Sequence, residues 1–202
     1  MRAICGKKKI MTRIFDETGR QVPVTLIKVD PNTVIQIKDS KKDGYKAVQL
    51  GAGTQRRLTK PLLGHVAKAN VKPKILFEIK TNKDYKVGDK VTLENFQEKE
   101  KVNVSGISLG KGFAGTVKRH GFKTGPKTHG SNNYRQPGSI GATGPQRVVK
   151  GRRMAGHLGA KKATVKNLEI FKIDKESGLI FLCGAVPGKR ESEIFIWSNS
   201  EN

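Results

Sequence analysis

Between Lys101 and Leu168 the chain contains no aspartate or glutamate, although 14 of its 40 lysines and arginines and 13 of its 23 glycines lie there. All 17 acidic residues fall outside these 68 residues. The like charges of such a segment repel one another, and its glycine content raises the entropy lost when the backbone becomes ordered. A fixed shape for this segment therefore requires a densely negative partner, and nucleic acid is the partner that fits.

The rest of the chain has an ordinary mixed surface with a basic bias. It carries the other 26 lysines and arginines against all 17 acids, and the whole chain has a net charge of +23. A charge of this size indicates polyanion binding and does not specify a fold. A length of 202 residues fits one domain, or one domain with an appendage.

Short segments before, after and at the two ends of the acid-free stretch have apolar residues at every second position, many of them β-branched, which predicts half-buried β-strands. These segments lie at residues 22–26, 35–37, 75–79, 102–104, 168–170, 179–183 and 194–197. Many short strands separated by turn signals predict a mainly β fold with a closed or nearly closed antiparallel barrel. Two short helices are also predicted, over Thr59–Asn70 with Pro61 in its first turn and over Phe113–His120.

Residues 122–160 cannot form a core of their own, because their larger apolar side chains are few and follow no period. A structureless insertion of this length in a compact domain is normally functional. Strands before and after it would make it an arm that leaves the barrel and returns. We expect the arm to stay disordered until nucleic acid neutralises it.

The motif Gly110–Gly115 matches G-x-G-x-x-G, but a dinucleotide site also needs an acidic residue about 20 positions further on. None occurs before Glu169, so we expect these backbone amides to approach a phosphate of nucleic acid instead. Three histidines lack a nearby carboxylate in sequence, which favours hydrogen bonding or stacking on RNA over catalysis or metal binding. They are His120, His129 and His157.

The two cysteines, Cys5 and Cys183, have no companion residues at metal-ligand spacing. We expect two small buried thiols in a reducing compartment, and a disulfide between them is the alternative. No apolar run approaches the roughly 18 to 20 residues of a membrane span.

Basic clusters in the acid-free stretch favour phosphate contacts over a merely solvated face, because no carboxylate compensates them. Examples are Lys118-Arg119, Lys150–Arg153 and Lys161-Lys162. Three aromatic residues lie among the clusters and either stack on unpaired bases or wedge the base of the arm against the barrel. They are Phe113, Phe122 and Tyr134.

Several ordered motifs resemble the bacterial-type large-ribosomal-subunit protein L-three family: Gly110–Arg119, Thr128–Gly130, Pro137–Gly141 and Lys150–Gly156. Matches near the two ends extend the resemblance over nearly the whole chain: Gly6–Lys8, Met11–Phe15, Thr59–Pro61 and Gly184–Gly188. The resemblance implies a six-stranded, translation-factor-like antiparallel β-barrel with short helices and a long extended basic arm. Residues 1–107 and 163–202 would form the barrel body, with a small helical insert near 59–70, and residues 108–162 the RNA-penetrating arm.

The same resemblance implies a structural constituent of the large ribosomal subunit. It would bind 23S-type rRNA near its 3′ end, join assembly early, and extend its arm toward the peptidyl transferase centre. Neighbouring large-subunit proteins fourteen and nineteen would be its other partners, in a cytoplasmic rather than an organellar ribosome. We expect no catalysis by the protein, no cofactor, no membrane and no small-molecule substrate.

The residues that we expect to contact RNA are basic or hydrogen-bonding side chains of the arm. They are Lys111, Lys118, Arg119, His120, Lys123, Lys127, His129, Arg135, Ser139, Arg147, Lys150, Arg152, Arg153, His157, Lys161 and Lys162.

Two other functions remain as alternatives. An enzyme acting on RNA or nucleotides would need an acid–base pair, a nucleophile with a partner or a correctly spaced cofactor loop, and the sequence offers none of these. A free-standing architectural DNA-binding protein would bind duplex DNA tightly at moderate salt and remain outside ribosomes.

Overall fold

The computed structural model describes residues 2–81 and 83–198, which divide into two compact units. The first unit holds the chain up to Ile107 and from Lys162 onward, and the second is Ser108–Lys161. None of the helices in the described residues is long and apolar enough to cross a membrane.

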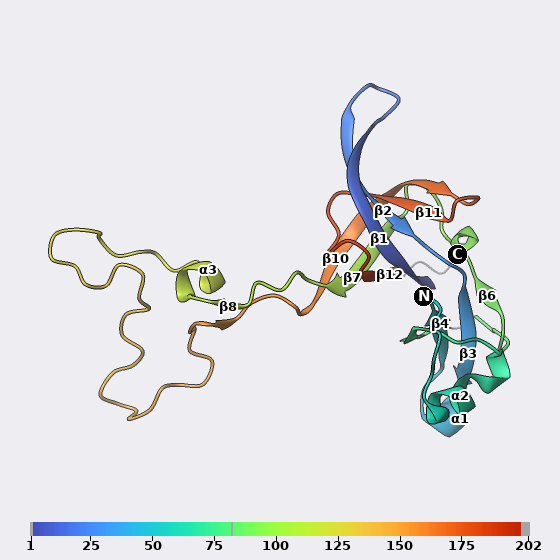
Figure 1. Ribbon diagram of the computed structural model, residues 1–202, viewed down its shortest axis with the longest axis horizontal. Helices are drawn as coiled ribbons and strands as arrows, with labels where there is room; N and C mark the ends of the chain where they lie inside the picture. Colours follow the sequence, from blue (N-terminus) through green and yellow to red (C-terminus); the bar gives the residue numbers. More distant parts are fainter. Residues whose placement is uncertain (1, 82, 199–202) are drawn as a thin grey trace. The chain divides into compact units, whose positions relative to one another are not determined.

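A closed barrel of six antiparallel strands forms the centre of the first unit (Figure 1). The strands follow one another around the barrel in the order β1-β12-β7-β10-β11-β2, which confirms the predicted six-stranded barrel. Their bounds are β1 (Arg2–Phe15), β2 (Gln21–Lys28), β7 (Lys101–Ile107), β10 (Lys162–Asp174), β11 (Leu179–Cys183) and β12 (Glu193–Ser198). Because β1 pairs with β12 and β7 pairs with β10, strands from both flanks and from both ends of the acid-free stretch close one sheet.

The barrel closes over a core of branched aliphatic side chains. Ile4, Ile27, Ile180, Leu182 and Ile196 are all fully buried and belong to one cluster. In β11 and β12 the buried positions recur at every second residue, as a sheet with one buried face requires. Burying such a side chain stabilises the fold by about 1.5–3 kcal/mol.

A separate four-stranded sheet, ordered β5-β4-β3-β6, accounts for the other strands found in the described residues of the first unit. Its strands are β3 (Asn32–Lys38), β4 (Ala47–Ala52), β5 (Ile75–Ile79) and β6 (Lys90–Val91). The strands predicted at residues 35–37 and 75–79 are confirmed, but their expected place in the barrel is wrong. They pack instead around a second apolar cluster that includes Val34, Leu50 and Ile79.

Buried hydrogen bonds join the two sheets. The Asn32 side chain at the start of β3 accepts a hydrogen bond from the Cys5 backbone amide at 2.8 Å. The Asn32 amide group also donates to the Cys5 carbonyl at 3.1 Å and to the Asp30 carbonyl at 2.8 Å. The fully buried Asn32 therefore has its polar atoms satisfied and holds β3 against β1.

The helix predicted over residues 59–70 is confirmed as α2 (Lys60–Val66) followed by the 3-10 turn η1 (Ala67–Ala69). Thr59 occupies its N-cap, and Asn70 ends the turn in a left-handed conformation with φ of 49°. The other short helices of the first unit are α1 (Ser40–Asp43) and η2 (Leu93–Asn95).

The second unit contains β8 (Phe113–Ala114), α3 (Thr116–His120) and β9 (Gly156–His157). The helix predicted over residues 113–120 is confirmed only from Thr116 onward. Its first residues form β8 instead, because Phe113 and Ala114 pair with His157 and Gly156. Residues 121–155, all of which the structure describes, form no helix or strand, and Figure 1 draws them as a winding tube.

Candidate nucleic-acid interface

All charged side chains of the second unit are cationic. Its 54 residues carry eleven lysines and arginines and no carboxylate side chain. Every ion pair found among the described residues joins side chains of the first unit, for example Arg2 with Glu100 and Lys38 with Glu78. The positive charge of the second unit is therefore not neutralised from within it.

The base of the second unit is a hydrogen-bonded stem, which we define as residues 108–122 and 154–161. Its two legs pair through Ser108 and Lys161 (amide to carbonyl, 2.9 Å), and through two bonds that involve Leu158. The Lys111 amide donates to the Leu158 carbonyl at 2.8 Å, and the Leu158 amide donates to the Gly112 carbonyl at 2.9 Å. The expectation that residues 122–160 lack structure is therefore wrong at their C-terminal end.

A very close backbone approach fixes the pairing of the two legs. Gly159 has φ of +78°, and a Cβ atom built on it would lie 2.0 Å from the Leu109 carbonyl oxygen. Only glycine fits here, because any side chain would collide with backbone and would also be strained at this φ.

The side chains of Arg119 and His120, at the end of α3, both reach the carbonyl of Met154 on the opposite leg. Arg119 Nη1 donates to this carbonyl at 2.7 Å, and His120 Nε2 lies 3.0 Å from it. Because a carbonyl oxygen can only accept, His120 holds its hydrogen on Nε2 in this arrangement. Of the predicted contact residues, all of which the structure describes, only these two are partly buried.

Beyond the stem lies the distal loop, residues 123–153, in which every residue is described and none is buried. A few local contacts shape it. The Gly125 amide donates to the Tyr134 carbonyl at 3.0 Å, and the Arg152 guanidinium donates to the Ser139 carbonyl. Because so little of its surface is buried, the loop has no apolar core that would fix its backbone conformation.

Fourteen of the sixteen predicted contact residues are exposed. Those in the stem are Lys111, Lys118, His157 and Lys161, and those in the distal loop are Lys123, Lys127, His129, Arg135, Ser139, Arg147, Lys150, Arg152 and Arg153. The last, Lys162, is the first residue of β10 and pairs with Ile107 in the barrel.

The aromatic residues of the second unit differ in their accessibility. The Phe113 ring is 80% exposed, as stacking on a flat partner requires. The Phe122 ring packs against His120 with centroids 5.9 Å apart, and Lys127 Nζ lies 5.4 Å from the Tyr134 ring centroid. Phe113 is therefore the ring most available to an external base.

The glycine-rich motif at Gly110–Gly115 does not form an open phosphate cradle. Its Lys111 amide already donates to Leu158, and its Phe113-Ala114 pair is a strand of the stem. The predicted approach of these amides to a phosphate is wrong for Lys111, because this donor is occupied. The motif instead permits the tight pairing of the two legs.

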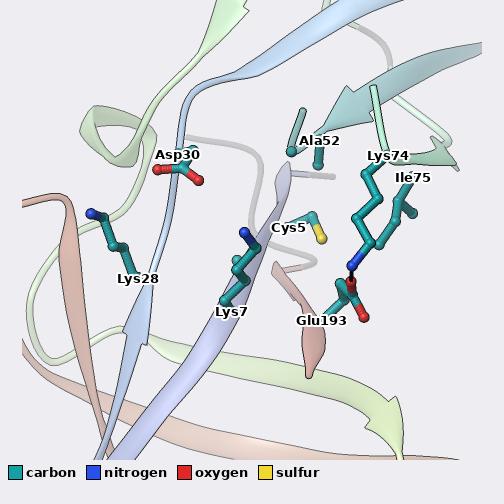
Figure 2. Close-up of a pocket in the computed structure, with 10 residues that line it drawn as sticks. Cys5, Lys7, Lys28, Asp30, Ala52, Lys74, Ile75 and Glu193 are labelled. Atoms are coloured by element: carbon teal, nitrogen blue, oxygen red, sulfur yellow. Dashed lines mark hydrogen bonds and ion pairs between the residues drawn. The ribbon is translucent and has the colours of Figure 1, made fainter. Parts of the chain in front are cut away.

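The first unit offers no comparable site around its buried cysteine. Figure 2 shows Cys5 between Lys7 and the ion pair of Lys74 with Glu193, whose charged atoms are 2.6 Å apart. The cavity holds about 20 Å³, which is room for one water molecule. Burial raises the pKa of the Cys5 thiol to about 12, so the thiol stays protonated and is a poor nucleophile at neutral pH.

Both cysteines are free, so the alternative of a disulfide between them is excluded by the structure. Cys5 is buried as expected, whereas Cys183 is only half-buried. Burial also raises the pKa of the Cys183 thiol.

The sequence does not identify Met154 or Gly156 as partners of Arg119. The Met154 acceptor is a backbone carbonyl, which any residue type could supply, so no sequence signal marks it. Gly156 belongs to a glycine-rich segment whose close contacts become visible only when the two legs are paired.

The first unit is built on a closed antiparallel barrel, and the second is a basic extension without carboxylates. These features place the chain in a class of basic proteins that combine a β-barrel with a cationic extension. Comparison with known proteins identifies the family within this class. Residues 6–182 match the family model described as Ribosomal protein L3. The chain therefore belongs to the ribosomal protein L3 family, as the motif resemblance predicted.

Individual relatives agree with this assignment over almost their full length. The large ribosomal subunit protein uL3 of Carboxydothermus hydrogenoformans is 49% identical over 200 residues, which cover 96% of each chain. The protein of the same name from Pelotomaculum thermopropionicum is 47% identical, over 96% of this chain and 95% of its own. That of Streptococcus pyogenes serotype M1 is 46% identical, over 98% and 96%.

Proposed function

We propose that this chain is a structural constituent of the large ribosomal subunit and that its second unit is an arm that penetrates ribosomal RNA. The observation that carries the proposal is the unneutralised charge of that unit: eleven cationic side chains, no carboxylate and no buried residue in the distal loop. Phosphates would neutralise the charge, and their fixed positions would supply the order that the missing core cannot.

In this function the exposed basic side chains of the arm contact phosphates. Arginines such as Arg135 and Arg147 suit two-pronged contacts, whereas lysines act as point charges. The exposed Phe113 ring would stack on an unpaired base. The barrel body would remain outside the RNA, with its own apolar core.

The family resemblance supplies the finer parts of the proposal. The RNA would be 23S-type rRNA near its 3′ end, bound early in assembly in a cytoplasmic ribosome. The arm would reach toward the peptidyl transferase centre, and large-subunit proteins fourteen and nineteen would be neighbours. The protein would position RNA and catalyse nothing itself, with no cofactor and no small-molecule substrate.

Sedimentation of ribosomal subunits tests this function. We expect the tagged chain to travel with the large subunit through a high-salt sucrose cushion and to be released when ribonuclease digests the RNA. Electrostatic contacts along an enclosed arm explain this behaviour, since enclosed ion pairs are screened less than exposed ones. Duplex DNA of the same length as the ribosomal RNA competes with that RNA for the chain.

Recovery of the chain at the top of the gradient, or equally tight binding to duplex DNA, would contradict the proposal and favour an architectural DNA-binding protein. Turnover of RNA by the purified chain would favour the enzyme alternative.

A further inference from the structure

We propose that Arg119 is a positioning residue of the arm and does not itself contact RNA. Together with His120 it holds the Met154 carbonyl and so fixes the stem from which the distal loop departs. We name this arrangement the clasp: the side chains of Arg119 and His120, the carbonyl of Met154 and the backbone of Gly156. The inference deepens the proposed function and rests on it for its RNA-binding readout.

The clasp closes a long loop of chain at one point. Arg119 and Met154 are 35 positions apart, yet Arg119 Nη1 lies 2.7 Å from the Met154 carbonyl oxygen. His120 Nε2 reaches the same oxygen at 3.0 Å, and a carbonyl has two lone pairs, so both donors can be accommodated. A hydrogen bond from a cation to a carbonyl is stronger than one between neutral groups.

Glycine at position 156 leaves the space in which the guanidinium lies. A Cβ atom on Gly156 would be 2.6 Å from Arg119 Nη1 and 3.1 Å from its Cζ. Because these atoms form the end of a flexible side chain, a methyl group here would displace the guanidinium rather than the backbone. The substitution Gly156→Ala therefore breaks the clasp without changing any charge.

Two residues of the clasp, Arg119 and Gly156, also form backbone hydrogen bonds or strand pairs within the stem. The Arg119 amide donates to the Gly115 carbonyl at 2.9 Å within α3, and Gly156 pairs with Ala114 in the β8–β9 ladder. Ala114 and Thr116 are the buried residues of this ladder and helix. The clasp therefore links α3 to the leg that carries β9, and its loss would loosen both legs.

The neighbouring Lys118 provides a matched comparison. It lies one position earlier on α3, is exposed, and its side chain forms no hydrogen bond, ion pair or ring contact among the described residues. A phosphate contact contributes about 0.7–0.9 to the slope of log affinity against log salt, whereas a positioning residue contributes to affinity alone. Replacing Lys118 should therefore change the slope of log affinity against log salt, whereas replacing Arg119 should not.

The test compares Arg119→Gln, Gly156→Ala and Lys118→Gln in the full chain. Hydrogen exchange of the Lys111 and Leu158 amides in the free protein reports on the stem. We expect both clasp variants to speed this exchange about tenfold, the effect of losing one charge-assisted hydrogen bond, and Lys118→Gln to leave it unchanged.

Titration with large-subunit rRNA at several salt concentrations gives the second readout. We expect the clasp variants to bind more weakly with the slope of the unmodified chain, and Lys118→Gln to lower the slope by about 0.7–0.9. The proposal is overturned if Arg119→Gln lowers the slope as Lys118→Gln does and leaves exchange unchanged, or if Gly156→Ala matches the unmodified chain in both readouts. A flat salt dependence for every chain would contradict the proposed function, and the exchange rates would still decide the clasp.

Discussion

Replacing Arg135, Arg147, Lys150 and Arg153 together by glutamine is expected to make the salt dependence of rRNA binding shallower by about 3 units on a log–log plot. All four side chains lie in the distal loop, are exposed and form no hydrogen bond, ion pair or ring contact among the described residues. Their loss therefore removes charge without disturbing packing. The affinity falls most at low salt, because each neutralised phosphate releases condensed counterions.

Four lysines of the first unit provide the control for this variant. Lys41, Lys42, Lys68 and Lys175 are also exposed, and their side chains form no hydrogen bond, ion pair or ring contact in the described part of the chain. Their replacement by glutamine removes the same net charge. We expect the slope to change by less than about 1 unit, since few of these lysines would meet a phosphate. Equal changes for the two sets would show that total charge, and not the arm, governs binding.

Replacing Ile180 by alanine is expected to lower the free energy of unfolding of the barrel by about 2–5 kcal/mol. Ile180 is fully buried in β11 within the main apolar cluster, so truncation leaves a cavity as well as losing apolar burial. This is a large part of the roughly 5–15 kcal/mol that stabilises a typical domain. Urea unfolding followed by the fluorescence of Trp197, the only tryptophan of the chain, measures the loss.

Ile10→Ala is the matched control, because the Ile10 side chain in β1 is 51% exposed. We expect a loss below about 0.5 kcal/mol for this variant. Similar losses for Ile10→Ala and Ile180→Ala would mean that the barrel interior is not the source of stability. The salt slope of Ile180→Ala should equal that of the unmodified chain at temperatures where it remains folded.

Alternation along single strands predicts the barrel well. Val102 and Val104 are buried in β7 while the polar Asn103 between them is only half-buried, so the period of two in the sequence is also the period of burial. Alternation identifies a buried face but does not say which sheet carries it. The sequence therefore predicts β3 and β5 as strands and still assigns them to the wrong sheet.

The strand β4 escapes prediction for a related physical reason. Five of its six residues are buried, so Ala47–Ala52 shows no polar alternation. Two small residues at its end, Gly51 and Ala52, also weaken the strand signal. Gly51 lies against Ile35 and Pro73, where a Cβ atom would be 2.4 Å and 2.8 Å from their side chains.

The composition of the acid-free stretch predicts the positive charge of the candidate interface but not its internal structure. The lack of periodicity correctly indicates that the distal loop has no core. The stem escapes prediction because β8 and β9 have two residues each and lie more than 40 positions apart. Their pairing depends on backbone hydrogen bonds and on the close approach of Gly159 to the Leu109 carbonyl, which leave no pattern in side-chain type.

A photo-crosslinking amino acid at position 149 of the distal loop, in assembled large subunits, decides whether this loop lies within RNA. The side chain of Val149 is 56% exposed, so its replacement should not disturb the fold. We expect its crosslinks to form with ribosomal RNA, whereas the same group at position 41 of the body forms few. The account is contradicted if position 149, in subunits that sediment normally, crosslinks only to protein or forms no crosslink at all. Either result would show that the carboxylate-free loop is not shaped by nucleic acid.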